Sequence, residues 1–407
     1  GKDIDMNELI DCAEALLKQY FSMDCGIQSV DVLSAPERRN LILRLHLAAD
    51  SKSTPSSIIL KQSLGTEEDE EETDARFARD WAGLEFLSQF PESEPLTPKF
   101  YGGSPALRFI LQEDLGHQHI SLVDSLTSSN TIQAEAALAR FMRSLGRMHA
   151  ASFQQLTQYQ RILGRINPGG CDEFATASSI RKDLIERLNA ATLALGLTVS
   201  QSLSDEVTMI TEHVVLPGAF TVLTHGDICP DNVFDHPAQD QDLQFIDFEW
   251  SWLRSALLDG TYLRMSFPTC WCARILPEAV IQSLEAIYRQ ELVKTIPAAQ
   301  DDALYQEAYV YACAFWVLQQ TVHFIPGVIE KERIGPSGPL PPDSLWVTAE
   351  NTVRPRVLAR LKAFIRISSQ ANQLPHLNEM ACAMLKILER IWAQTHPLEF
   401  YPAFRDY

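Results

Sequence analysis

The N-terminal part of the chain combines apolar spacings typical of helices with others typical of strands. Apolar residues recur every three or four positions in 7–20 and 77–87, which predicts two amphipathic helices. Leucines occupy every second position of 41–47, and 57–62 is a second apolar run of strand length, so we expect the two to pair as a hairpin. A further pair of strands is expected within 99–112.

Helical spacing dominates the chain from about residue 117 onward. A short β interlude is expected between Thr221 and Asp247, and the Pro- and Gly-rich stretch 335–343 is typical of a loop. We therefore expect an α+β fold, with a small strand-rich N-terminal lobe and a larger, mainly helical C-terminal lobe. Helices are predicted at 134–152, 179–195, 202–213, 277–293, 303–323, 354–369 and 377–394.

Composition and charge narrow the classes of function. Hydrophobic residues make up 46% and charged residues 21% of the 407 residues, which is typical of a soluble globular protein. The formal net charge of −19 argues against nucleic acid as a partner, because its phosphates are contacted through Lys and Arg. An acidic surface would concentrate cationic small molecules, although it more often serves solubility. The acidic run 66–74 is interpreted as a solvated loop or helix start.

Cysteine spacing and hydropathy indicate the cellular compartment expected for the protein. The eight cysteines form no CxxC pair and no zinc-like pattern with His, so we expect neither a metal cluster nor a disulfide framework. The longest apolar run, Tyr309 to Leu318, is too short to span a bilayer, and the sequence opens without a signal-peptide pattern. These features favour a cytoplasmic protein that does not bind membranes.

The strongest chemical signal lies in 223–234 and 243–249. Phosphoryl transfer needs metal ions and a carboxylate near the attacking hydroxyl, and Mg²⁺ prefers hard oxygen ligands. Asn232 opens one short apolar strand and Asp247 ends the next, so an antiparallel hairpin is expected to bring these two oxygen ligands side by side. Asp227 lies on the loop just before Asn232. The arrangement suits a metal–nucleotide complex.

Within these stretches, the patterns His-Gly-Asp-x-x-x-x-Asn and Ile-Asp-Phe-Glu resemble the signature of the aminoglycoside phosphotransferase family, relatives of choline kinase and the protein kinases. The resemblance implies a protein kinase-like two-lobed fold that uses ATP and Mg²⁺. It implies that Asp227 is the catalytic base and that Asn232 and Asp247 are metal ligands. It also implies that His225 buttresses the catalytic loop and that Asp259 braces it.

The upstream half of the chain agrees with this resemblance. Lys61 ends an apolar strand, and its counterpart in the family holds the α- and β-phosphates, with the Ile59 position lining the adenine pocket. The partner of this lysine should be a helix carboxylate. Helical spacing selects Asp80, on the buried face, where the family usually has Glu. Glu85 is expected to point elsewhere and to face water.

The stretch 108–116 resembles the strand and hinge between the lobes of the family. Backbone groups of Glu113, Asp114 and Leu115 would meet the adenine there. The resemblance thus implies an N-lobe over 1–113 that binds the nucleotide, a C-lobe over 114–407 that holds the catalytic loop and the acceptor site, and a hinge at about 112–117.

The sequence also departs from the family pattern. The segment 33–40, which should cover the phosphates, contains no glycine. Cys229 stands where family members often have His and where protein kinases have Lys, and the missing Lys argues against a protein kinase. His149, on a helix that resembles the one beneath the catalytic loop, is interpreted as a core or capping residue rather than a catalytic one.

Three functions remain open on the sequence alone. We favour an ATP-dependent phosphotransferase that acts on a hydroxyl of a small molecule. The alternatives are a catalytically silent, nucleotide-binding relative that acts as a partner or scaffold and, third, a protein kinase. Aromatic residues near Asp247 could form a pocket for a cationic acceptor, although such residues more often serve packing. They are Trp250, Trp252, Tyr262, Phe267 and Trp271.

Overall fold

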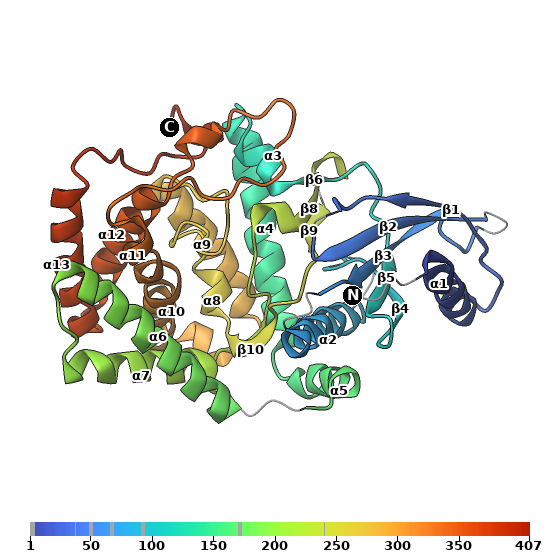
Figure 1. Ribbon diagram of the computed structural model, residues 1–407, viewed down its shortest axis with the longest axis horizontal. Helices are drawn as coiled ribbons and strands as arrows, with labels where there is room; N and C mark the ends of the chain where they lie inside the picture. The colour runs from blue at the N-terminus through green and yellow to red at the C-terminus, as the bar shows by residue number, and fades with distance from the viewer. Residues whose placement is uncertain are drawn as a thin grey trace. The chain divides into compact units, whose positions relative to one another are not determined.

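The computed structural model describes residues 5–36, 38–48, 52–65, 69–90, 94–169, 173–239 and 241–407. The chain forms two compact units, and each unit contains segments that are distant in the sequence (Figure 1). The first unit comprises Gly1–His119, Thr157–Gly170 and Gln244–Ser251. The second unit comprises Ile120–Leu156, Cys171–Leu243 and Trp252–Tyr407.

The first unit is built on a five-stranded antiparallel sheet with the strand order β1-β2-β3-β5-β4. The predicted hairpin is confirmed, since β2 pairs with β3 and Leu43 lies opposite Leu60. Alternation along β2 sends Leu43, Leu45 and Leu47 into the core. The strands are β1 (Ile27–Val32), β2 (Asn40–Leu47), β3 (Ser57–Ser63), β4 (Phe100–Ser104) and β5 (Phe109–Glu113).

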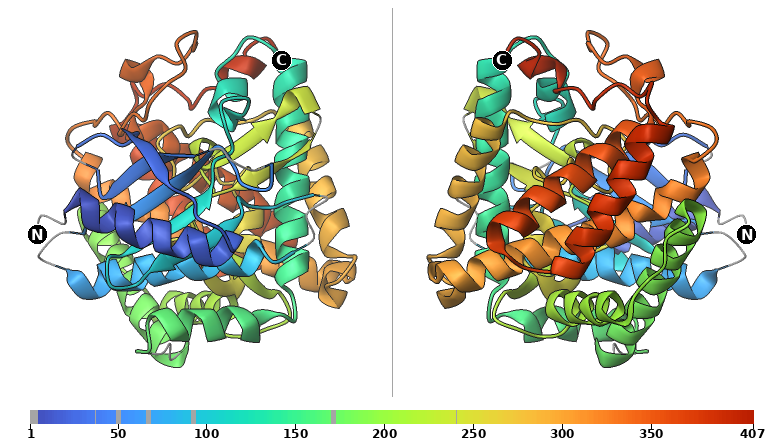
Figure 2. Two further views of the ribbon diagram at one scale, coloured as in Figure 1. Left: turned by 90° about the vertical axis from the view of Figure 1, so that its right-hand side faces the viewer. Right: turned by 90° about the vertical axis from the view of Figure 1, so that its left-hand side faces the viewer.

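Helix α1 (Met6–Phe21) covers one face of this sheet (Figure 2). Asp5 caps its N-terminus by accepting a hydrogen bond from the backbone N–H of Asn7 at 3.0 Å. Leu9, Ala13 and Leu17 are buried and belong to the same hydrophobic cluster as the leucines of β2. The helix predicted over 7–20 is therefore confirmed.

Helix α2 (Glu70–Leu87) begins inside the acidic run. Asp69 is its N-cap and accepts from the backbone N–H of Glu72 at 3.2 Å. The acids of the first turn lie at the positive end of the helix dipole, where negative charge is stabilising. The described part of the run is thus a helix start, as expected, while 66–68 lie outside the described residues. A third helix, α5 (Leu156–Ile166), was not predicted from the sequence.

The second unit is mainly helical, and a helix is present at each of the seven ranges predicted for it. The stretch 335–343 is an irregular loop, as predicted. The helices are α3 (Leu122–Leu126), α4 (Thr131–Ser152), α6 (Glu173–Leu195), α7 (Gln201–Val215), α8 (Leu257–Gly260), α9 (Glu278–Leu292), α10 (Asp302–Gln320), α11 (Ile325–Val328), α12 (Val353–Ala371) and α13 (Pro375–Ile391).

Two small sheets accompany these helices. One contains β6 (Ile120–Ser121), β8 (Val233–His236) and β9 (Gln241–Phe245). The other pairs β7 (Thr221–Thr224) with β10 (Trp252–Ser255), so the β interlude extends beyond the predicted end at Asp247. Short 3₁₀ turns are η1 (Pro230–Asn232), η2 (Pro237–Gln239), η3 (Pro297–Gln300), η4 (Val322–Phe324), η5 (Thr348–Glu350) and η6 (Pro402–Phe404).

The C-terminal eighty or so residues are an integral part of the second unit. The carboxylate of Glu206 caps the N-terminus of helix α13, where it accepts hydrogen bonds from the backbone N–H of His376 at 3.0 Å and of Leu377 at 2.7 Å. The hydroxyl of Tyr401 donates to the carbonyl of Cys272 at 2.6 Å.

The predicted α+β class is confirmed by the two units together. Among the described residues, no helix is both long and apolar enough to cross a membrane.

A buried ion pair connects α4 with β8. Arg140 donates from Nε to Asp235 Oδ1 at 2.9 Å and from a terminal nitrogen to Oδ2 at 2.8 Å. Asp235 is 0% exposed. A bidentate pair of this kind satisfies both charges, and its rupture leaves a buried carboxylate without compensation.

We therefore expect Arg140→Met to lower the free energy of unfolding by about 3–5 kcal/mol, measured by urea denaturation. Arg390→Met, at an exposed position of α13, is the matched control and should change it by less than about 0.5 kcal/mol. Equal stability of the two variants would show that the Arg140–Asp235 pair does not support the second unit.

Candidate active site

Lys61 lies on β3 with its ammonium group buried between two carboxylates. Its Nζ donates to Asp80 Oδ2 at 2.8 Å and also to Asp247 Oδ1. Burial lowers the pKa of Lys61, but the negative charges of Asp247 and Asp80 outweigh this effect and raise the pKa above its ordinary value. Lys61 is therefore charged at neutral pH. The predicted ion pair between Lys61 and Asp80 is confirmed. Ile59, two residues earlier, shares the strand face of Lys61.

The carboxylate of Asp80 holds two groups at once. While Oδ2 accepts from Lys61, Oδ1 accepts from the backbone N–H of Phe248 at 2.8 Å. One side chain of α2 thus fixes both the lysine and the residue that follows Asp247. The shorter Asp, where the family usually has Glu, reaches both partners. The contact with Phe248 could not be predicted, because a backbone donor leaves no mark in the sequence.

Helix α2 also holds the segment 247–251 at other points. Arg79 Nε donates to the carbonyl of Glu249 at 2.8 Å. A Cβ added at Gly83 would lie 2.6 Å from Cβ of Phe248, so glycine allows the helix and the segment to approach closely. Asp247 has a φ of 62°, in the left-handed region that is uncommon for residues other than glycine. Its backbone is therefore held in place by these contacts rather than by its own preference.

Glu85 does not face water as expected. Its side chain is 17% exposed and accepts from Arg165 at 2.6 Å. Arg165 lies on α5, which the sequence did not predict, so the partner of Glu85 was missed with that helix.

The hinge residues are held mainly by the side chain of Asp114. Its carboxylate accepts from Arg44 Nε at 2.7 Å, from Ser57 Oγ at 2.6 Å and from the backbone N–H of Gly116 at 3.0 Å. Burial would raise the pKa of Asp114, but these hydrogen bonds outweigh it and lower the pKa. The backbone N–H of Glu113 donates to the carbonyl of Lys99 at 2.8 Å. The adenine contacts expected of Glu113, Asp114 and Leu115 stay predictions.

In the second unit, the buried carboxylate of Asp259 organises the loop that follows β7. It accepts from the backbone N–H of His225 at 2.7 Å and of Gly226 at 3.1 Å. His149 Nε2 lies 2.8 Å from the same carboxylate, and His149 Nδ1 lies 2.7 Å from the hydroxyl of Tyr288. The expected bracing contact of Asp259 is thus present, and His149 is a buried core residue, as interpreted from the sequence.

Asp227 and Asn232 lie on this same loop. The backbone N–H of Asp227 donates to His225 Nδ1 at 3.2 Å, and the side-chain nitrogen of Asn232 donates to the carbonyl of Asp227 at 3.3 Å. The expected hairpin after Asn232 is present, since β8 and β9 are neighbours in one sheet. Asp247 belongs to the first unit, so its alignment with Asn232 stays a prediction.

The structure contains a disulfide that the sequence analysis did not anticipate. Cys229 is buried and is bonded to Cys270, 41 residues later. The expectation of no disulfide is therefore wrong for this pair. Cysteines so far apart carry no local spacing signal, and only the tertiary fold brings their loops together.

A family model matches residues 84–300, just over half of the chain. The chain belongs to the ecdysteroid kinase-like family. The matched segment includes the loop of Asp227 and Asn232 together with Asp247, whereas Lys61 and Asp80 precede it. At the coarser level, the resemblance to protein kinase-like small-molecule kinases is confirmed, although the matching family is not the aminoglycoside phosphotransferases themselves. No curated protein is significantly similar to the chain.

Solved structures of small-molecule kinases are also similar to this ecdysteroid kinase-like chain. The choline kinase of Streptococcus pneumoniae is 14% identical, with 88% of this chain and 99% of that chain covered and a TM-score of 0.41. The choline kinase of Cryptosporidium parvum is 10% identical, with 94% of this chain and 99% of that chain covered and a TM-score of 0.45. The ethanolamine kinase of Plasmodium vivax is 13% identical, with 83% of this chain and 82% of that chain covered and a TM-score of 0.43. Similarities this distant do not bear on the substrate.

Three of the five aromatic residues proposed to line an acceptor pocket differ in burial in this ecdysteroid kinase-like chain. Tyr262 and Phe267 are fully buried and therefore serve packing. Trp271 is partly exposed, donates from Nε1 to Asp231 Oδ2 at 3.2 Å and meets Trp346 edge to face at 5.8 Å.

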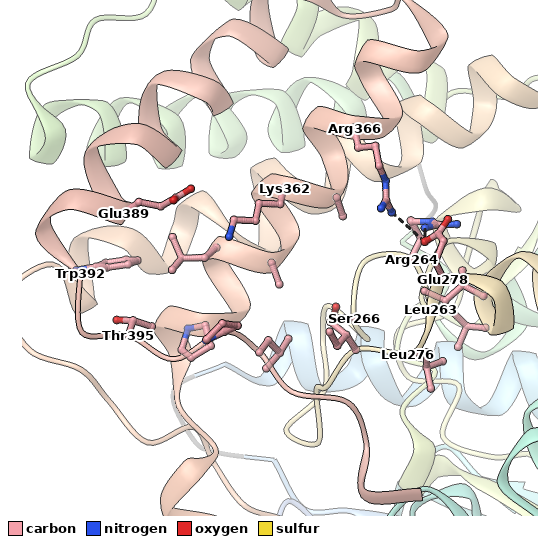
Figure 3. A pocket seen from close by; sticks show the side chains of 18 of the residues that line it. Leu263, Arg264, Ser266, Leu276, Glu278, Lys362, Arg366, Glu389, Trp392 and Thr395 are labelled. Atoms are coloured by element: carbon pink, nitrogen blue, oxygen red, sulfur yellow. Dashed lines mark hydrogen bonds and ion pairs between the residues drawn. The ribbon is translucent and has the colours of Figure 1, made fainter. Parts of the chain in front are cut away.

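A separate pocket of about 450 Å³ is lined by residues of α9, α12 and α13 in the second unit (Figure 3). Its walls combine apolar side chains such as Leu276 and Trp392 with the charged side chains of Lys362 and Arg366. None of the predicted site residues lines it. It is therefore distinct from the candidate active site.

The close approach of α2 to Phe248 gives a test of the first unit. Gly83→Ala should lower the free energy of unfolding by about 1–3 kcal/mol, because the added methyl group must displace Phe248. Gly164→Ala, in α5, is the matched control, since its Cβ meets no atom within 4 Å and alanine favours a helix. Chemical denaturation measures the free energy of unfolding of both variants. A Gly83→Ala protein as stable as the control would contradict the packing described.

Proposed function

We propose that this protein transfers the γ-phosphate of Mg-ATP to a hydroxyl group of a small molecule. Its family supports kinase-like chemistry. The observation that carries the proposal is the shared carboxylate of Asp80, which holds Lys61 and the backbone next to Asp247. A cation suited to phosphates and an oxygen ligand suited to a metal are thereby fixed by a single side chain. Phosphoryl transfer depends on such positioned charges more than on covalent chemistry.

The donor set of the chain fits a magnesium nucleotide. Lys61 supplies a charged ammonium group, and Asp247 and Asn232 supply the carboxylate and amide oxygens that Mg²⁺ prefers. Because the nitrogen of Asn232 donates to the Asp227 carbonyl, its Oδ1 is the atom left to coordinate. When bound, Mg²⁺ would neutralise negative charge on the phosphate oxygens.

Asp227 is the residue that we assign as the general base. The amides of the two preceding residues donate to the buried Asp259, and its own N–H donates to His225, so the loop is fixed before substrate arrives. Such pre-organisation lowers the entropic cost of aligning the acceptor. The Asp227 carboxylate accepts the proton of the attacking hydroxyl as the oxygen–phosphorus bond forms and later releases it to solvent. His225 is a positioning residue in this scheme.

Asp227→Asn should retain Mg-ATP binding while turnover falls by about 10²-fold or more, because the variant keeps the size of the side chain but loses its basicity. Asp247→Asn should instead weaken metal-dependent nucleotide binding. Titration with Mg-ATP and ADP release with a panel of hydroxylated acceptors measure the two effects separately.

Asp406→Asn, at an exposed position near the C-terminus, is the matched control and should leave both measurements unchanged. Near-normal turnover of Asp227→Asn would show that another group is the base. Wild-type protein that binds Mg-ATP but phosphorylates no acceptor would favour the silent relative, and phosphorylation of protein substrates alone would favour a protein kinase.

A cationic acceptor is the finer proposal. Trp271 donates to the carboxylate of Asp231 and packs edge to face against Trp346. Because the chain also carries a net charge of −19, a positively charged alcohol would be attracted to this part of the second unit. Cationic alcohols should therefore have a lower KM than neutral sugars, and added salt should raise that KM. Equal or better turnover of neutral or anionic acceptors would contradict this preference and leave the kinase proposal intact.

A further inference from the structure

Two cysteines from loops far apart in the sequence meet beside the proposed base. Cys229 and Cys270 form a disulfide with their Cα atoms 5.4 Å apart. Cys229 Sγ lies 3.2 Å from Asp227 Oδ1. One carboxylate oxygen of Asp227 and the two sulfur atoms all lie within 4.8 Å of one another.

We propose that Cys229, Cys270 and Asp227 form a binding site for a thiophilic divalent cation of the zinc class, which becomes available when the disulfide is reduced. In the disulfide the two sulfur atoms are bonded to each other and cannot act as thiolate ligands. Once reduced, they supply two soft ligands and Asp227 supplies a third, with water completing a tetrahedral shell. Thiolates select zinc over magnesium, so this site differs in kind from one built on Asn232 and Asp247.

The distances required are compatible with these two loops. Zinc–sulfur bonds of about 2.3 Å place two thiolates of a tetrahedral site roughly 3.8 Å apart. The sulfur atoms of Cys229 and Cys270 therefore have to separate by no more than a rotation of their side chains, because their Cα atoms are already 5.4 Å apart.

Non-covalent contacts hold the catalytic loop to the loop of Cys270 when the disulfide is broken. The buried hydroxyl of Tyr262 donates to the carbonyl of Gly226 at 3.2 Å and also lies 2.8 Å from the hydroxyl of Thr269, the neighbour of Cys270. Tyr262 thus ties the residue before Asp227 to the residue before Cys270. Reduction is expected to leave the two sulfur atoms close to each other.

Two buried arginines of α12 fix the second of these loops through its backbone. Arg360 donates to the carbonyls of Met265 and Ser266 at 2.9 and 3.0 Å. Arg356 donates to the carbonyls of Cys270 and Trp271 at 3.3 and 2.7 Å. The position of Cys270 is therefore set by α12 and does not depend on the disulfide.

The chemistry balances with a dithiol as the reductant. The dithiol loses two electrons and two protons and becomes a disulfide, while the Cys229–Cys270 bond breaks and each cysteine gains a proton. Binding of the cation then releases those two protons. With Asp227 engaged as a ligand, its carboxylate can no longer accept the proton of an acceptor hydroxyl. This inhibition rests on the proposed function, whereas metal binding does not.

Cobalt(II) is the probe that tests the site, because cobalt–thiolate bonds absorb in the near ultraviolet. The full-length protein is reduced with excess dithiothreitol, freed of reductant without oxygen and titrated with Co²⁺. Reduced wild-type protein should give the charge-transfer band with one equivalent, and Zn²⁺ should abolish it by displacement. Oxidised protein should give no band. Cys229→Ser and Cys270→Ser should lose it, whereas Cys382→Ser, at an exposed cysteine of α13, should keep it.

Two measurements keep the test independent of how well the serine variants fold. Asp227→Asn retains both thiols and should shift the Co²⁺ titration to higher concentrations. In reduced wild-type protein that has not been denatured, Zn²⁺ should protect two thiols from a disulfide-exchange reagent. A reduced protein without the band, a band that persists in Cys229→Ser, or thiols that Zn²⁺ does not protect would each overturn the proposal.

Turnover separates this inference from the proposed function. Saturating Zn²⁺ should slow the reduced enzyme by about 10²-fold, the scale of losing a general base, and leave the oxidised enzyme unaffected. Equal inhibition of both forms would show that Zn²⁺ acts elsewhere. A protein that is inactive in either redox state contradicts the proposed function, and the Co²⁺ titration still decides on the metal site.

Discussion

A buried ammonium group is the constraint on which the first unit depends. Lys61 is 8% exposed, and taking its charge out of water is unfavourable unless negative groups surround it. Asp80 and Asp247 supply them, from positions 19 and 186 residues away in the sequence. Removing either carboxylate would leave charge poorly compensated inside the protein. The sheet, α2 and the segment 244–251 are therefore held in one arrangement by the charge that the proposed reaction also uses.

The second unit follows a different principle, in which buried side chains hold the backbone of loops. The carboxylate of Asp259 accepts hydrogen bonds from two loop amides, and Arg356 and Arg360 donate hydrogen bonds to loop carbonyls. Burial lowers the pKa of Arg360 to about 9, so the side chain is still charged at neutral pH and the carbonyls take the place of water around it. The C-terminal residues thus have a structural role, because the arginines of α12 position the loop opposite the proposed base.

The sequence predicts features that depend on residues close together in the chain better than contacts between elements that are far apart in it. The helices of the second unit and the β2–β3 hairpin follow from local periodicity, and the Lys61–Asp80 pair follows from a family resemblance combined with helical spacing. The Asp80–Phe248 and Glu85–Arg165 contacts and the Cys229–Cys270 bond were missed, because each depends on how separate elements pack. The lobe boundary at 113/114 and the roles of Asp227, Asn232 and Asp247 stay predictions.

The discontinuous make-up of the first unit has a consequence for the order of events on the ribosome. The sheet and α2 emerge early, but Gln244–Ser251, which carries the second counter-charge of Lys61, emerges much later. At translation rates of about 5–20 residues per second, the 186 residues between Lys61 and Asp247 take roughly 10–40 s to synthesise. During that interval the nascent first unit has Asp80 but not Asp247 to compensate its buried lysine. The growing chain is therefore expected to complete this unit only after every helix that precedes β9 in the sequence has been made.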